Sequence, residues 1–226
     1  MKFTIHHYSE LESTQTTAKY FLHEEKAEEG TVIIADQQTF GYGRQGKKWE
    51  SLLGNLCFSV ILTPEDKPLS DYGQLGFVVA VAVQKALHSL FPLLLINLKW
   101  PNDIIIDHKK IGGIIIEAEQ NGVVIGIGMN VNSAPTGAIC LKDCVSSALD
   151  LEEILKAILK SLWDVYSGWL TDNFDSVKET WTKHAYQLDE MIEREDTKGQ
   201  FIGISDEGAM LLRDELGIIQ KVTTVQ

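Results

Sequence analysis

The stretch QQTFGYGRQGKKW, residues 37–49, carries the side chains of this sequence that are best suited to bind an anion. Arg44, Lys47 and Lys48 lie among three glycines, and residues 37–48 include no acidic residue, although the net charge of the chain is −12. Glycines allow backbone N–H groups to turn toward an anion, and Trp49 adds a flat apolar face. We therefore expect a loop that closes over a phosphate-bearing ligand and excludes water, mobile when empty and ordered when occupied.

This stretch imitates two common phosphate-binding motifs. Gly41, Gly43 and Gly46 match the dinucleotide motif G-x-G-x-x-G, and residues 41–48 nearly form a Walker A loop, but Lys48 stands where that loop needs a hydroxyl side chain. Both motifs must open a helix, whereas a strand (residues 55–62) is the next element expected here. Neither motif therefore fits, and the alternative to an anion-binding loop is an ordinary mobile hairpin loop.

A second group of polar residues lies in KWPNDIIIDHKKIGG, residues 99–113. Asp103 begins a strand and Lys110 follows across the short turn at residues 107–109, so a two-stranded ribbon brings them close together. Adjacent glycines within a strand, here Gly112 and Gly113, often mark the close approach of a ligand or another backbone. The alternative is a salt-bridged hairpin with a glycine bulge and no ligand, because isolated ion pairs are common.

Two shorter motifs add polar groups. In GIGMNVN, residues 126–132, Asn130 and Asn132 face the same side if the strand continues, so they could recognise a polar ring edge or cap the strand end. In ESTQ, residues 12–15, Ser13 and Thr14 open a helix, for which an N-cap role is the default.

Hydrophobic periodicity predicts the elements that position these groups. Strands are expected at residues 2–8 (an edge strand), 31–36, 55–62, 93–100, 103–106, 111–118 and 122–131. The last two strands pair as a hairpin through Asn121 and Gly122. Helices are expected from the Ser13–Thr14 cap to Gly30, and at residues 72–91, 151–174 and 176–184, with residues 133–144 as a loop.

The sequence changes character near residue 186. Residues 186–226 contain three or four short strand candidates separated by DTKG, SDEG and DELG. A unit of this size buries little core alone, so we expect it to pack on the larger domain, residues 1–185.

Composition excludes several classes of protein. An excess of Asp and Glu (32) over Lys and Arg (20) argues against a general nucleic-acid binder. No apolar run approaches the ~18 residues of a membrane span, and the N-terminus does not have the pattern of a signal peptide. Cys57, Cys140 and Cys144 form no C-x-x-C motif, so we expect reduced thiols and a cytoplasmic protein.

In this order, ESTQ, Q-T-x-G-x-G-R-x-G-x-x-W, KWPND with K-x-G-G, and G-x-G-x-N-x-N resemble the biotin protein ligase family over roughly residues 1–150. The resemblance implies an α+β fold, with a central mixed sheet and flanking helices like those of class II synthetases, plus a small SH3-like β-barrel at the C-terminus. It implies that biotin and MgATP form biotinyl-5′-AMP, from which biotin passes to a lysine of a biotin carboxyl carrier protein. For this family, the implied carrier is that of acetyl-CoA carboxylase.

The resemblance also implies roles for individual residues. Arg44, Lys110 and Asp103 would be catalytic, with Asp103 organising Lys110, the metal or the incoming amine. The residues implied to bind biotin are Ser13, Thr14, Gln15, Gln38, Tyr42, Gly43, Arg44, Lys110, Gly112 and Gly113. The residues implied to bind ATP are Arg44, Trp49, Lys99, Asn102, Lys110 and Asn130. The ligands of Mg²⁺ stay open, as does the choice between a monomer and a homodimer.

This sequence departs from the family pattern at Tyr42 and Lys47, where many members have arginine or another basic residue. The lower loop charge predicts weaker retention of the adenylate. Because the motifs begin at Ser13, we expect no N-terminal winged helix and no DNA binding. One alternative is a lipoate or octanoate ligase or transferase of the same fold, which the residues of the motifs disfavour. The other is a non-catalytic biotin-binding regulator, which the presence of Arg44 and Lys110 disfavours.

Overall fold

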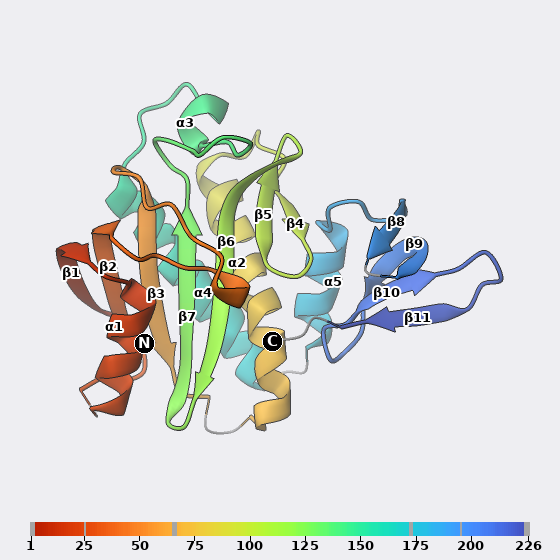
Figure 1. Ribbon diagram of the computed structural model, residues 1–226, viewed down its shortest axis with the longest axis horizontal. Helices are drawn as coiled ribbons and strands as arrows, with labels where there is room; N and C mark the ends of the chain where they lie inside the picture. Colours follow the sequence, from red (N-terminus) through yellow and green to blue (C-terminus); the bar gives the residue numbers. More distant parts are fainter. Residues whose placement is uncertain (1–2, 25, 65–66, 172–173, 195, 224–226) are drawn as a thin grey trace.

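The computed structural model describes residues 3–24, 26–64, 67–171, 174–194 and 196–223, and its largest feature is a seven-stranded mixed sheet (Figure 1). In order across the sheet the strands are β1 (Thr4–Leu11), β2 (Thr31–Gln38), β3 (Leu56–Leu62), β7 (Gly122–Met129), β6 (Lys109–Glu119), β5 (Asp103–Ile106) and β4 (Asn97–Lys99). β1 and β2 pair in parallel and the other neighbours are antiparallel. The predicted central mixed sheet, its edge strand and its β6–β7 hairpin are confirmed.

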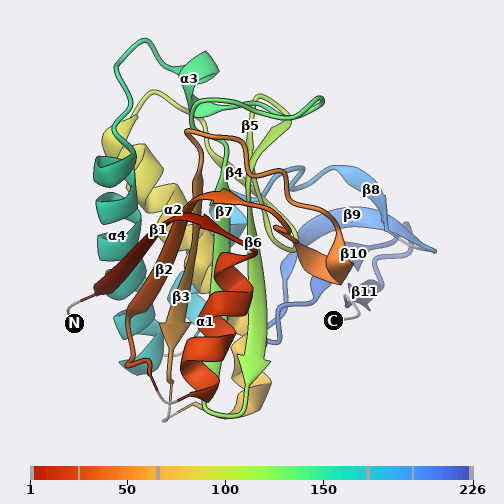
Figure 2. The ribbon, with the colours of Figure 1, turned by 60° about the vertical axis from the view of Figure 1, so that its left-hand side comes forward.

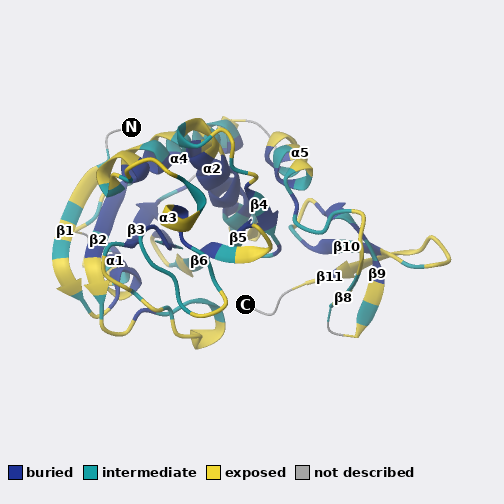
Figure 3. Ribbon diagram, turned by 90° about the horizontal axis from the view of Figure 1, so that it is seen from above, coloured by how far each residue is buried: buried dark blue, intermediate teal, exposed yellow. Residues whose placement is uncertain are grey.

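Side chains alternate in direction along β3, so the two faces of the sheet pack against different helices. Phe58 and the other even-numbered residues of β3 belong to the large core, together with α2 (Leu75–Leu90) and α4 (Leu151–Thr171). Ile61 faces the opposite side and packs with residues of α1 (Thr14–His23). Figure 2 shows α1 on one face of the sheet and α2 and α4 on the other. α2 is buried along most of its length beside α4 (Figure 3).

The C-terminal residues form a separate four-stranded antiparallel sheet. Its strands, in the order β11-β10-β9-β8, are β11 (Ile219–Val222), β10 (Met210–Arg213), β9 (Thr197–Ile204) and β8 (Met191–Arg194). The sheet packs on the rest of the molecule through Phe201, whose ring lies 6.4 Å from that of Trp181 in α5 (Asp175–Lys183). Both rings belong to the large core, so the expectation that this unit packs on the larger domain is confirmed.

The first helix is shorter than expected. α1 ends at His23 rather than reaching Gly30. Glu24, Glu28 and Glu29 follow it, and carboxylates are unfavourable near a helix C-terminus because of the helix dipole. Residue 25 of the predicted helix lies outside the described residues.

Other boundaries also differ. β4 covers Asn97–Lys99 instead of residues 93–100, since its neighbour β5 is short and Leu93 and Leu95 are 95% and 82% exposed. The helix predicted at residues 72–91 begins at Leu75, after a 3₁₀ segment at Leu69–Gln74. The loop expected at residues 133–144 contains a short helix, α3 (Leu141–Cys144).

Some predicted segments reach residues that the structure leaves undescribed. They are residue 2 of the first strand, residues 172–173 of the helix predicted at 151–174, and residues 195 and 224–226 of the C-terminal unit. Among the described residues, no helix combines the length and the apolar content needed to cross a bilayer.

Candidate active site

A cavity of about 410 Å³ lies over the middle of the large sheet, and glycines form part of its floor. Gly126 and Gly128 alternate along β7, and Gly113 of β6 pairs with Gly128. Because these residues carry no side chain, groups from other elements can lie directly on the sheet. A volume of this size is typical of a small-molecule site.

Side chains of other residues occupy the space that the glycines leave. A Cβ added at Gly128 would lie 2.5 Å from the indole ring of Trp49, and one added at Gly126 would lie 2.5 Å from Ile115 Cγ2 and 2.7 Å from Gln15 Oε1. The indole N–H of Trp49 donates to Cys57 Sγ at 3.4 Å on the neighbouring strand β3. The glycines therefore determine how closely Trp49 and Gln15 approach the sheet.

Replacing Gly128 with Ala should displace the Trp49 ring, because the methyl group and the indole cannot share this space. Overpacking of this kind lowers the free energy of unfolding by about 1–3 kcal/mol. Thermal unfolding measures this change. Gly168→Ala in α4 is the matched control: among the described residues, no atom beyond the backbone of its own helix and its chain neighbours lies within 4 Å of its added Cβ, and alanine should raise stability by roughly 0.5–1 kcal/mol. A Gly128→Ala protein as stable as its parent, with the Trp49 ring in place, would contradict this packing.

One end of the cavity is a network of hydroxyl and amide groups. Gln38 Oε1 accepts from the Thr14 backbone N–H at 2.8 Å and from its hydroxyl at 3.1 Å, while Gln38 Nε2 donates to Ser51 Oγ at 2.8 Å. The Ser59 hydroxyl lies 2.9 Å from Thr14 Oγ1 and 3.0 Å from Gln15 Oε1. Donors and acceptors thus alternate within a small volume, as recognition of a polar ring requires.

Ser13 has a structural role as well as a place in the cavity lining. Its hydroxyl accepts from the Thr16 backbone N–H at 3.4 Å, which makes it the N-cap of α1. Gln15 Nε2, in the first turn of the helix, donates to the Val124 carbonyl of β7 at 3.0 Å. The cap and this contact fix the start of α1 against the sheet, and the N-cap interpretation of ESTQ is confirmed.

The predicted proximity of Asp103 and Lys110 is confirmed. Lys110 Nζ lies 2.6 Å from Asp103 Oδ1 across the β5–β6 ribbon. The same ammonium group is 5.7 Å from the centre of the Trp49 ring and lies over the bare backbone of Gly113. Burial lowers the pKa of Arg44, while the charge of Asp103 acts in the opposite direction. A guanidinium, an ammonium and a carboxylate therefore share one partly buried space.

Residues 41–49, the glycine loop, contain a three-residue 3₁₀ turn and an isolated bridge between Tyr42 and Lys48 but open no helix, so neither phosphate-binding motif is present. Contacts hold the loop near both ends. The Tyr42 hydroxyl donates to Glu117 Oε2 at 3.0 Å, and Lys19 Nζ lies 3.2 Å from the same oxygen. At the other end Trp49 contacts Cys57 and the glycine floor. Arg44 lies between these two contacts in the sequence and lines the cavity.

Most of the residues singled out in the sequence line this cavity. They are Ser13, Thr14, Gln15, Gln38, Tyr42, Gly43, Arg44, Trp49, Lys99, Asn102, Asp103, Lys110 and Gly113. Gly112 and Asn130 do not. Neighbours in a strand face opposite sides, so Gly112 packs against the backbone of β7, where an added Cβ would lie 2.9 Å from the Gly128 carbonyl. Asn130 follows the end of β7, is 2% exposed, and donates to the Ile139 carbonyl at 3.2 Å.

Cys57, Ser59 and Arg194 are among the lining residues that were missed in the sequence. Cys57 and Ser59 of β3 face the cavity, and the period-two pattern of that strand, with Phe58 on the opposite face, is the signal that could have identified them. Arg194 of β8 also lines the cavity, although it belongs to the C-terminal sheet. No local pattern indicates that a residue so distant in the sequence reaches the site.

The cavity is basic in an acidic chain. Its described lining contains one carboxylate, that of Asp103. Its cationic side chains are Arg44, Lys47, Lys48, Lys99, Lys110 and Arg194. Among the described residues, no group of three His, Cys, Asp or Glu side chains could hold a metal ion by itself. The arrangement suits a ligand with several negative charges.

Known proteins are similar to this chain in both sequence and fold. Residues 8–132 match the model of the biotin/lipoate A/B protein ligase family. The chain is 35% identical to the bifunctional ligase/repressor BirA of Bacillus subtilis, in an alignment that covers 92% of this chain and 69% of that protein. It is 31% identical to the biotin–[acetyl-CoA-carboxylase] ligase of Paracoccus denitrificans, over 82% of this chain and 85% of that protein.

A solved structure extends the similarity to nearly the whole chain. The biotin protein ligase of Aquifex aeolicus, in complex with biotin and ATP, superposes with a TM-score of 0.86 and 29% sequence identity. The superposition covers 97% of this chain and 95% of that chain, and so includes the C-terminal sheet.

Proposed function

The chain belongs to the biotin/lipoate A/B protein ligase family, and we propose that its basic cavity joins biotin to AMP before biotin passes to a lysine of a carrier protein. The protein is a biotin protein ligase, with biotin and ATP as its substrates. The observation that best supports this chemistry is the cavity itself, in which a cluster of cations adjoins a closed network of amide and hydroxyl groups.

In the first step two anions must meet. A carboxylate oxygen of biotin attacks the α-phosphorus of ATP, the bond from that phosphorus to the bridging oxygen breaks, and pyrophosphate leaves with the electron pair. Lys110 and Arg44 offset the repulsion between carboxylate and phosphate, and preorganised charge of this kind is often the largest contribution to catalysis. Asp103 holds the Lys110 ammonium group over the glycine floor.

The polar network and the wall beside Trp49 receive the two substrates. Thr14, Gln15 and Gln38 offer the amide and hydroxyl partners for the ureido ring of biotin. Trp49 and Asn102 lie on the side of the cavity that we assign to ATP. Gly112 and Asn130 act indirectly, since neither lines the cavity: Gly112 packs against the backbone of β7, and the Asn130 backbone N–H donates to the Ile111 carbonyl of β6 at 2.8 Å.

In the second step the carrier replaces AMP. The neutral amine of a carrier lysine attacks the acyl carbon of biotinyl-5′-AMP, a C–N bond forms, the C–O bond to the phosphate breaks, and the amine loses a proton. The relative from Paracoccus denitrificans is named for acetyl-CoA carboxylase. A biotin carrier domain of a carboxylase is therefore the protein partner, and we propose the carrier of acetyl-CoA carboxylase.

We propose that Mg²⁺ enters the site on the phosphates of ATP. Magnesium sites often combine one or two carboxylates with substrate phosphates, and the described lining provides one carboxylate, Asp103, which suits this arrangement. Bound there, the ion would neutralise phosphate charge. The division at residues 185 and 186, the cytoplasmic location and the absence of DNA binding stay predictions.

Exchange of pyrophosphate into ATP tests the first step and the choice of acid. With biotin present, we expect labelled pyrophosphate to enter ATP, because formation of the adenylate is reversible. Lipoate and octanoate serve as the matched alternatives. Exchange that depends on lipoate but not on biotin would contradict the proposal.

A further inference from the structure

Arg194 is the contribution of the C-terminal sheet to the cavity. It is the last residue of the edge strand β8, where it pairs with Thr197 of β9, and its half-buried side chain lines the same space as Arg44 and Lys110. Its Nε atom is fully buried and has no hydrogen-bond partner within the described part of the chain. A buried donor without an acceptor raises the free energy of the folded protein. A ligand that supplies an acceptor to Arg194 Nε would remove this cost.

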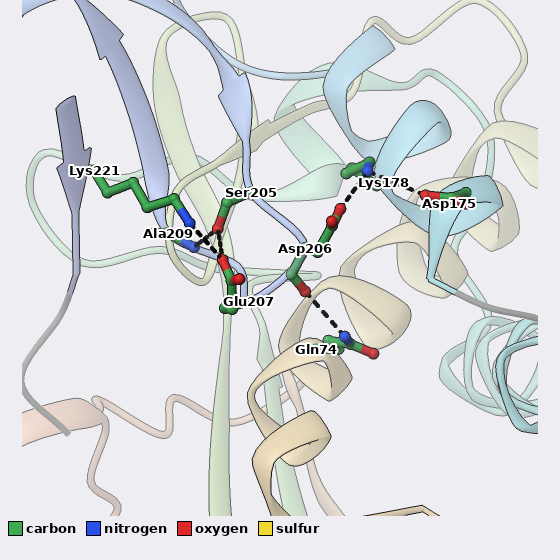
Figure 4. Close-up of polar contacts among 8 residues, drawn as sticks. All are labelled: Gln74, Asp175, Lys178, Ser205, Asp206, Glu207, Ala209 and Lys221. Carbon is green, nitrogen blue, oxygen red and sulfur yellow. Dashed lines mark hydrogen bonds and ion pairs between the residues drawn. The ribbon is translucent and has the colours of Figure 1, made fainter. Parts of the chain in front are cut away.

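The position of Arg194 is supported by contacts that fix the C-terminal sheet to the catalytic domain. The connection between β9 and β10, residues 205–209, carries most of them (Figure 4). Lys178 of α5 forms an ion pair with Asp206, and Gln74 Nε2 donates to the Asp206 carbonyl at 2.9 Å. The Trp100 indole N–H donates to the Gly208 carbonyl at 3.0 Å, which ties the connection to the KWPND motif.

The connection between β9 and β10 is also stabilised by contacts within the C-terminal sheet. The Ser205 hydroxyl donates to Glu207 Oε2 at 2.7 Å and accepts from the Ala209 backbone N–H at 3.2 Å, while Lys221 Nζ lies 3.0 Å from the same Glu207 oxygen (Figure 4). The Ser205 hydroxyl and Lys221 lower the pKa of Glu207 to about 2. The sheet that carries Arg194 is thus held at a defined place beside the site.

Two of the other cations of the lining already have a role in the proposed chemistry. Lys110 is paired with Asp103 over the glycine floor, and Arg44 lies on the loop beside it. Arg194 approaches from the other sheet, and within the described residues no carboxylate pairs with its guanidinium group. A guanidinium group presents a planar set of donors that matches the oxygens of a phosphate.

We propose that Arg194 binds the β- and γ-phosphates of ATP and stabilises pyrophosphate as it leaves. This assignment rests on the proposed function and deepens it. When the α-phosphorus is attacked, the bridging oxygen takes the electron pair of the broken bond, and the new charge falls on pyrophosphate. Arg194 donates hydrogen bonds to that group and transfers no proton. Biotinyl-5′-AMP has no β- or γ-phosphate, so Arg194 serves the first step alone.

The two half-reactions separate this role from a structural one. Arg194→Met keeps the apolar stem and removes the donors, and we expect kcat/KM for ATP in pyrophosphate exchange to fall about 10- to 100-fold. Arg194→Lys retains the positive charge but lacks the planar set of donors, so its kcat/KM for ATP should lie between those of the parent and Arg194→Met. Transfer of biotin from synthetic biotinyl-5′-AMP to a carrier domain should stay at the parent rate in both variants, which also shows that they are folded.

Arg213→Met is the matched control. Arg213 is an exposed arginine of the same sheet and does not line the cavity, so its replacement should change neither half-reaction. Parent-like exchange in Arg194→Met would overturn the proposal, as would an equal loss in both half-reactions. If the unmodified protein fails to exchange pyrophosphate with biotin, the proposed function itself is wrong and this assignment falls with it.

Discussion

Replacing Lys110 with Met lowers the rate of biotin-dependent pyrophosphate exchange by about 10²- to 10³-fold, the usual effect of removing one preorganised charge donor from a reaction centre. The ammonium group lies over Gly113 and beside the Trp49 ring, where the carboxylate and the α-phosphate are proposed to meet. Its loss also removes the lysine partner of the Asp103 carboxylate, which lies 2.6 Å from Lys110 Nζ in the parent protein, and leaves that negative charge beside the two reacting anions. Initial rates at saturating biotin and ATP measure the effect.

A second substitution divides the Lys110 effect into its two causes. In Lys110→Met/Asp103→Asn the unpaired carboxylate is gone, so the double variant should exchange pyrophosphate faster than Lys110→Met and still far more slowly than the parent. Asp103→Asn alone removes the group that holds Lys110 and should slow exchange to a smaller extent. Exchange within a few-fold of the parent rate in Lys110→Met would show that another group neutralises the reacting anions.

Replacing Arg44 with Gly should allow biotin activation to continue while the adenylate escapes. Arg44 lies between the Tyr42–Glu117 contact and the Trp49–Cys57 contact, so removal of its side chain leaves the loop attached near both ends. Loss of a charged hydrogen-bonding group from the phosphate side should speed adenylate release about 10- to 100-fold. Trapping of released biotinyl-5′-AMP gives the rate, and labelling of a bystander protein beside the carrier gives the selectivity.

Arg44→Lys is the control for this prediction, because it keeps the charge and loses the planar donors. Slow, parent-like release from Arg44→Gly, with formation of the adenylate reduced instead, would place Arg44 in the first step only. The weaker retention expected from Tyr42 and Lys47 stays a prediction for the unmodified chain. The structure adds one relevant contact, since the Tyr42 hydroxyl binds Glu117, which also pairs with Lys19.

Local sequence rules predicted the parts of the site that lie close together in the chain. A tight turn brought Asp103 to Lys110, and the N-G turn placed the β6–β7 hairpin and with it the glycines of β7. The same rules did not distinguish Gly112 from Gly113, because the sequence does not reveal which of two adjacent glycines faces the cavity and which meets another backbone until the register of the sheet is known.

The contributions of distant segments could not be predicted in this way. Ser59 meets Thr14 and Gln15 only when α1 lies on the face of the sheet to which β3 points that side chain. Arg194 reaches the cavity because the C-terminal sheet is fixed through Asp206 and Gly208. Such placements depend on packing between elements, which carries no periodic signal in the sequence.

The most direct test of the central claim is the mass of a biotin carrier domain after incubation with the protein, biotin, ATP and Mg²⁺. We expect the carrier to gain the mass of one biotinyl group at a single lysine, only when biotin and ATP are both present, and much more slowly with Lys110→Met. A carrier whose mass stays unchanged, while the protein still binds biotin, would contradict the account and favour a non-catalytic biotin-binding protein.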